Sequence, residues 1–184
     1  MMNTYVVHVE NKPGVLTRVS SLFRRRAFNI DSLTVGRTEK PEVSRMTITV
    51  DAGPDEARRI EASLYKLVND LLVENITAEP AITRDLAMIK VAARHEERSH
   101  ILQLANVFRA RVVDVAPDSV VIEITGGEDK IDGLLEVLRP FGVLEMVRTG
   151  IVAMRRGAKS QASSLPSEEM DAVPMEGDDE GQSV

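Results

Sequence analysis

Apolar residues recur along the chain with two different spacings, and each change of spacing marks a change of secondary structure. Alternation over residues 5–10 and 43–50 predicts strands, and residues 30–36 also have a strand pattern. Helical spacing predicts two helices between these strands. Their apolar stripes are Val15, Leu16, Val19, Leu22 and Phe23, then Ala57, Ile60, Leu64, Leu67 and Val68. A fourth strand over residues 72–77 completes the order βαββαβ.

The second half repeats this order. Strands are predicted over 87–93, 112–116, 120–125 and 143–147, and residues 150–154 are compatible with an extension of the last strand. The two helical stripes are Ile101, Leu102, Ala105 and Phe108, then Ile131, Leu134, Leu135 and Leu138. Pro80 interrupts the pattern in a link near residues 79–84. We therefore predict an α+β protein with two ferredoxin-like sandwiches, in domains of residues 1–79 and 80–156.

The charge is concentrated at the C-terminus. Residues 155–184 carry three basic and seven acidic side chains, so this segment holds −4 of the net charge of −6. From residue 157 the hydrophobic periodicity stops and Ser, Pro, Gly and acids dominate, so we expect a disordered acidic tail over 157–184. A body near neutrality argues against a nucleic-acid partner. No apolar run approaches the ~18 residues of a membrane span, and no signal-peptide pattern occurs, so we expect a cytoplasmic chain without membrane contact.

The sharpest local feature is the loop of residues 10–16, between the first strand and the first helix. Pro13 fixes the turn, Gly14 lets the backbone approach a ligand closely, and the helix that follows presents free N–H groups to an anion. Asn11 can donate and accept hydrogen bonds, so it could orient a zwitterion. The alternative is an ordinary turn in which Asn11 caps the helix.

Other polar residues are open to two interpretations. Asn29 could be a second ligand group or a turn residue. His8 could act as a proton switch, but the pattern favours a histidine on the surface of the sheet. His95 and His100 lack the i, i+4 spacing of a metal pair, and the chain has no cysteine, so we expect no metal site. We find no recognisable acid/base pair or nucleophile motif, so we predict no catalytic residue.

Residues 9–19, 22–33 and 44–48 resemble the small regulatory subunit of acetolactate synthase. The string Phe28-Asn-Ile-Asp-Ser-Leu33 followed by Ser44-Arg-Met-Thr47 is specific to that family. The Asn-x-Pro-Gly turn, here Asn11 to Gly14, is shared more widely by amino-acid-sensing ACT domains. The resemblance covers residues 2 to about 156, and is weaker in the second half.

The resemblance implies a non-catalytic partner of an enzyme. Such subunits bind and activate a large catalytic subunit that condenses 2-oxo acids, and they make it sensitive to valine or another branched-chain amino acid. The resemblance places thiamine diphosphate, Mg²⁺ and FAD on that large subunit, and no cofactor on this chain. It also implies a homodimer through the ACT domains. The effector would bind between two copies, with Asn11, Gly14, Val15 and Leu16 from one chain and Asn29 and Ile30 from the other.

In this arrangement the effector's carboxylate would meet the helix start near Gly14, and its apolar side chain would rest on Val15, Leu16 or Val35. The corresponding place in the second half lacks Gly and carries Glu96 and Glu97, which would repel a carboxylate. We therefore expect the effector site in the first domain and partner binding in the second. The alternatives are a stand-alone amino-acid-binding regulator, for which we find no DNA-binding element, and a small enzyme.

Overall fold

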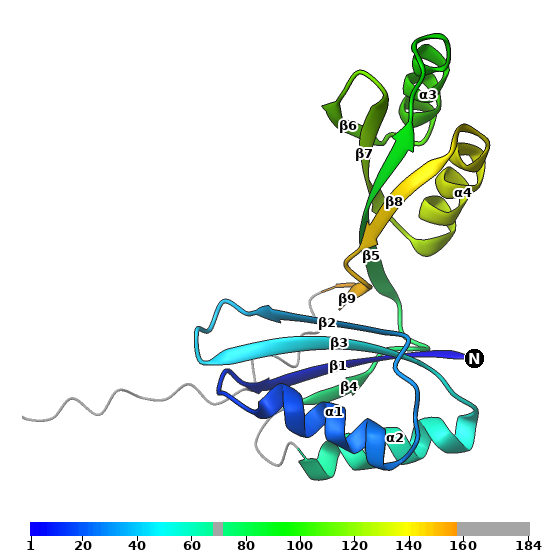
Figure 1. Cartoon of the computed structure of the whole chain (residues 1–184). Helices are drawn as coiled ribbons and strands as arrows, with labels where there is room; N and C mark the ends of the chain where they lie inside the picture. Colours follow the sequence, from blue (N-terminus) through cyan, green and yellow to red (C-terminus); the bar gives the residue numbers. More distant parts are fainter. Residues whose placement is uncertain (68–71, 158–184) are drawn as a thin grey trace, which may run out of the picture.

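The computed structural model describes residues 1–67 and 72–157. This part folds into two units of βαββαβ order, each an antiparallel sheet with helices on one face (Figure 1). The predicted α+β class with two ferredoxin-like sandwiches is thereby confirmed. The predictions for Val68 and for the tail from residue 158 onward lie outside the described residues.

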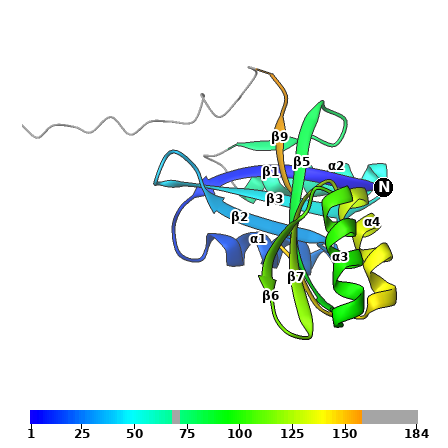
Figure 2. The same cartoon turned by 90° about the horizontal axis from the view of Figure 1, so that it is seen from above.

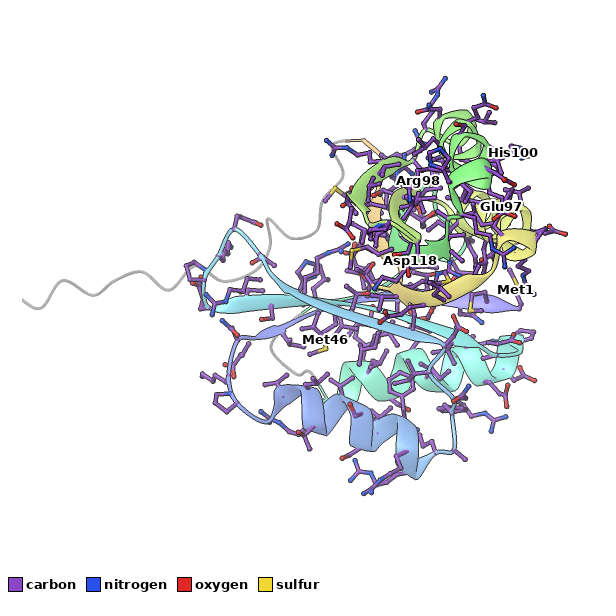
Figure 3. All side chains as sticks on the ribbon, turned by 45° about the horizontal axis from the view of Figure 1, so that its top comes forward. Met1, Met46, Glu97, Arg98, His100 and Asp118 are labelled. Atoms are coloured by element: carbon purple, nitrogen blue, oxygen red, sulfur yellow. The ribbon has the colours of Figure 1, made fainter. Side chains whose placement is uncertain are left out.

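The N-terminal unit is a four-stranded sheet in the order β2-β3-β1-β4. Alternate residues of β1 and β3 face α1 and α2 and fill the core, with Tyr5, Ile48 and Ile60 fully buried. Figure 3 shows Met46 on this helix-covered side of the sheet. The elements are β1 (Met2–Glu10), α1 (Val15–Arg25), β2 (Ser32–Arg37), β3 (Val43–Asp51), α2 (Pro54–Leu67) and β4 (Val73–Asn75).

The C-terminal unit is a sheet in the order β6-β7-β5-β8, with α3 and α4 on one face. Its core combines alternate residues of β5 and β7 with the apolar stripes of the two helices, including Ile89, Ile122 and Leu134. The elements are β5 (Ala81–Ala92), α3 (His95–Val107), β6 (Arg111–Val115), β7 (Ser119–Gly126), α4 (Glu128–Leu138), the short 3₁₀ helix η1 (Arg139–Phe141), β8 (Val143–Arg148) and β9 (Val152–Arg155).

The segment after β8 differs from the prediction. Residues 150–154 do not extend β8. Gly150 takes a left-handed φ of 86°, the chain turns, and β9 pairs antiparallel with residues 81–84 of β5. Those residues, predicted as a link, are therefore the first part of a long strand. Both segments cross the N-terminal sheet on the face opposite α1 and α2 (Figures 1 and 2).

This crossing also corrects the prediction for His8. Val6 and His8 lie on the face of β1 away from the helices, where we expected solvent. Ala153 of β9 packs against Val6 and Ile76 there, and only 4% of His8 remains exposed. The sequence pattern of one strand cannot reveal that a segment more than 140 positions away covers its second face. His95 and His100 are exposed, as predicted.

Candidate functional site

The loop before α1 has the backbone that its sequence predicts. Gly14 is the residue before the helix and has a left-handed φ of 85°. A Cβ at this position would meet nothing within 4 Å, so glycine is required by the backbone conformation and not by crowding. Gly14 itself is exposed, so the approach to the first amides of α1 is open to solvent.

The N-terminus of α1 differs electrostatically from the other helix starts. Among the four α-helices of residues 1–67 and 72–157, only α1 has no acidic residue in its first turn. The other three place carboxylates where they stabilise the positive end of the helix dipole. At the N-terminus of α1 no carboxylate of the first turn compensates the helix dipole, so this helix end can bind an external anion.

Asn11 anchors the loop and does not cap the helix. Its backbone N–H donates to Glu42 O at 2.6 Å, and its Nδ2 donates to Pro41 O at 2.9 Å. No side chain caps α1, so the alternative in which Asn11 caps the helix is wrong. These two hydrogen bonds hold the loop against the β2–β3 hairpin. The Oδ1 of Asn11 takes no part in them.

Apolar side chains of the predicted site lie on the helix side of the sheet edge. Val15 is half-buried against the core, whereas Leu16 and Val35 are 45% and 44% exposed. Val35 pairs with the buried Met46 across β2 and β3, so the two side chains point to the same face. Edge strand β2 therefore presents apolar surface that a single chain does not cover.

Asn29 and Ile30 lie beyond the opposite end of α1. Ala27 has a positive φ of 55°, and Phe28 N–H bonds to Phe23 O at 3.1 Å, which ends the helix. Asn29 is exposed and Ile30 packs partly against the core. The 11 residues of α1 separate this turn from Gly14 by about 16 Å. One chain therefore cannot bring both groups to a small ligand, and the predicted seven-residue site stays a prediction that needs a second copy.

The corresponding place in the C-terminal unit carries charged side chains of the protein itself. Glu96 and Glu97 lie in the first turn of α3. The Arg98 guanidinium, labelled in Figure 3, donates to the carbonyl of Ala116 at 2.7 Å and to that of Ala93 at 3.3 Å. The acids near the start of α3 are where the sequence analysis placed them.

Sequence reasoning missed the polar contacts between the units. Arg45 of β3 donates to the carbonyl of Ala153, and Arg155 of β9 lies 3.5 Å from the carboxylate of Glu74. One sequence signal was available: the second face of β1, β3 and β4 carries polar and charged residues together with the apolar Val6 and Ile76. A face of such mixed composition can be exposed to solvent or packed against another segment, and the sequence pattern does not distinguish the two.

Residues 1–67 and 72–157 contain no group of three or more His, Cys, Asp or Glu side chains arranged to hold a metal ion. Their helices include none that is long and apolar enough to cross a membrane.

Comparison with known protein families gives two matches, one in each half of the chain. Residues 6–70 match a profile described as the AHAS small subunit-like ACT domain, and residues 84–157 match one described as the small subunit of acetolactate synthase.

Relatives with assigned names are similar over nearly their whole length. The chain is 50% identical over 159 residues to the probable acetolactate synthase small subunit of Archaeoglobus fulgidus, covering 86% of this chain and 99% of that protein. It is 45% identical over 157 residues to the acetolactate synthase small subunit of Mycobacterium bovis, covering 85% and 94%. The crystal structure of the acetolactate synthase small subunit from Thermotoga maritima superimposes with a TM-score of 0.78 at 38% identity, covering 86% of this chain and 99% of that one.

Proposed function

Because the chain belongs to the acetolactate synthase small-subunit family, we propose that it binds the large catalytic subunit, activates it and makes it sensitive to a branched-chain amino acid. The large subunit then carries out the condensation of 2-oxo acids in valine, leucine and isoleucine biosynthesis. Thiamine diphosphate, Mg²⁺ and FAD belong to that partner in this proposal, and the present chain supplies regulation only.

The effector site lies between the N-terminal units of two copies. The observation that carries this proposal is the separation of the site residues by the full length of α1, about 16 Å. Asn11 and the open, acid-free start of α1 receive the carboxylate and orient the ligand. Asn29 and Ile30 of a second copy complete the enclosure, and the exposed Leu16 and Val35 cover the ligand's short apolar side chain.

Regulation requires that the effector and the large subunit favour different arrangements of the small subunit. Allosteric coupling energies are usually about 1–3 kcal/mol, which corresponds to about 5–150-fold in affinity. The structure offers a continuous connection for such coupling. β5 pairs with β9 above the N-terminal sheet and then becomes the central strand of the C-terminal sheet. A change in dimer geometry at the N-terminal units can therefore move the surface by which the C-terminal units hold the partner.

Reconstitution tests the proposal directly. The chain is co-expressed with the large subunit of the same organism, the complex is isolated, and acetolactate formation is measured with and without valine, leucine and isoleucine. We expect co-purification, a higher rate than with the large subunit alone, and inhibition by at least one of the three amino acids. A chain that binds an amino acid but neither binds nor activates the large subunit would instead be a stand-alone regulator.

A further inference from the structure

A cavity of about 390 Å³ lies between the N-terminal sheet and the segment that returns from the C-terminal unit. It is on the face of the sheet opposite α1 and α2 (Figure 1). His8 from β1 and Arg45 from β3 contribute to its wall, together with Arg155 of β9. Cavities of this size hold small organic ligands.

The basic groups of the cavity are incompletely compensated. Glu74 lies 3.5 Å from Arg155, so these two charges balance each other. Arg37 and Arg45 then face only one further carboxylate in the wall, that of Glu39. Burial lowers the pKa of Arg45, although the charge of Glu74 opposes this effect. A partly buried cation whose charged form is disfavoured gains from an anion beside it.

His8 is the titratable group in the cavity wall. It is 96% buried, and its Nδ1 has no hydrogen-bond partner among the described residues. Because that nitrogen has almost no accessible surface, it does not itself contact the cavity, and the imidazole responds to a ligand through the charge placed beside it. Burial, and then the charge of Arg45, lower the pKa of His8, while Glu39 acts in the opposite direction.

The composition of the wall limits the charge and shape of the ligand. The three arginines exceed the two glutamates by one charge, so a ligand with one negative charge neutralises the wall, whereas a dianion would leave an uncompensated negative charge there. Ile76 and Met154 add an apolar part to the wall, which suits a short hydrocarbon chain. The group that combines these features is a small aliphatic monocarboxylate.

We propose that this cavity is a binding site for a small aliphatic monocarboxylate, held by Arg45 and Arg37 beside His8. The site is complete within one chain, and it does not depend on the proposed effector site between two copies. Because Arg45 also donates to Ala153 of β9, a ligand here would stabilise the packing of the C-terminal segment on the N-terminal sheet.

The test uses the full-length chain with isotope-labelled histidine. It is titrated with isobutyrate at several pH values, and NMR monitors the signals of the three imidazoles. His8→Gln assigns the His8 signal, and the exposed His95 and His100 serve as internal references. We expect a saturable shift of His8 alone and a rise in its pKa, since a bound anion favours the imidazolium form. Chloride at equal ionic strength should cause no such shift, and inorganic phosphate should bind more weakly.

Matched arginine variants locate the site. Arg37→Gln, at the exposed rim, should weaken isobutyrate binding about tenfold or more. Arg25→Gln, exposed on α1, should leave it unchanged. The proposal is overturned if the three histidines move together, if chloride acts as isobutyrate does, or if the two variants behave alike.

A carboxylate could also come from the acidic C-terminal segment, which begins next to the cavity residue Gly157. A chain truncated after Gly157 separates the two sources. An unchanged response to isobutyrate supports the small-molecule site. A His8 pKa that is already raised in the full-length chain, and that falls on truncation, would assign the carboxylate to the chain itself and overturn the proposal.

Discussion

Arg148 at the end of β8 donates through Nε to the Oδ2 of Asp85 at 2.7 Å, at the point where β5 leaves the N-terminal sheet. Asp85 is only 3% exposed and also accepts from the Thr149 hydroxyl at 3.1 Å. Burial alone would lower the pKa of Arg148, but the hydrogen bond and charge of Asp85, together with the charges of Asp132 and Glu128, outweigh it and raise that pKa. This pair fixes the turn from which β9 returns.

Replacing Asp85 should destabilise the fold. Asp85→Asn leaves the half-buried guanidinium with Asp132 as its remaining ion-pair partner, so we expect a loss of about 2 kcal/mol in the free energy of unfolding. Urea denaturation measures it. Asp132→Asn is the control, because Asp132 is 53% exposed and exposed pairs contribute about 0–1 kcal/mol. Equal losses for the two variants would contradict the importance assigned to the Asp85 contact.

His8 should make stability depend on pH. Its pKa is lowered in the folded chain from the usual 6.5, first by burial and then by Arg45. In the window between the two pKa values the unfolded state binds more protons than the folded state, so stability falls as the pH drops through 6.5 toward the folded pKa. His8→Gln should lose less stability than the parent between pH 7 and pH 5 in urea denaturation. A parallel pH dependence of the two proteins would exclude this contribution.

Gly14→Asp should weaken effector inhibition of the reconstituted enzyme. The new carboxylate would repel the ligand's own, and we expect at least tenfold more amino acid for half-inhibition. Gly14→Asn is the matched control, because asparagine, like aspartate, can adopt the left-handed backbone at φ 85° but carries no charge. If the Asp variant is as sensitive as the parent, the proposed site is in the wrong place.

Mixing two damaged chains should restore inhibition if the site lies between copies. Homodimers of Asn11→Ala or of Asn29→Ala carry the defect in both sites. In a mixed dimer one site holds both substitutions and the other is intact, so random exchange should restore about a quarter of the sites. Isothermal calorimetry of the mixture measures the recovered fraction. No recovery, with mixed dimers verified by mass spectrometry, would place both residues in one chain's site or in none.

Gly150→Ala should loosen the packing of the two units. Gly150 has a φ of 86°, and a Cβ there would lie 3.1 Å from Thr34 Oγ1 and 3.2 Å from Ser32 Cβ. The backbone strain and the close contacts together should destabilise the packing of β9 by about 1–3 kcal/mol. Amide exchange of β9 should therefore accelerate. Gly36→Ala, with open space around its Cβ, is the control.

Much of the fold follows from local pattern. The alternation around Tyr5 and Ile48, the stripe from Val15 to Phe23, and their repetition in the second half specify strands and helices with one apolar side each. Each unit buries its own apolar sides in its own core. The order of the elements and the fold class could therefore be predicted from the sequence. The Asn11–Gly14 loop was also identifiable, because proline and glycine restrict a turn locally.

The segment that covers the second face of the N-terminal sheet is set by long-range packing. That cover depends on Gly150 reversing the chain, on β9 pairing with the start of β5, and on Arg45 reaching Ala153. These contacts join residues more than 60 positions apart, and no periodicity within one strand encodes them. They bury His8, which its own strand pattern had assigned to solvent, and they form the cavity beside it. Local spacing of apolar residues, proline and glycine specifies the elements and the exposed loop. Long-range packing determines which polar residues are buried between the two units.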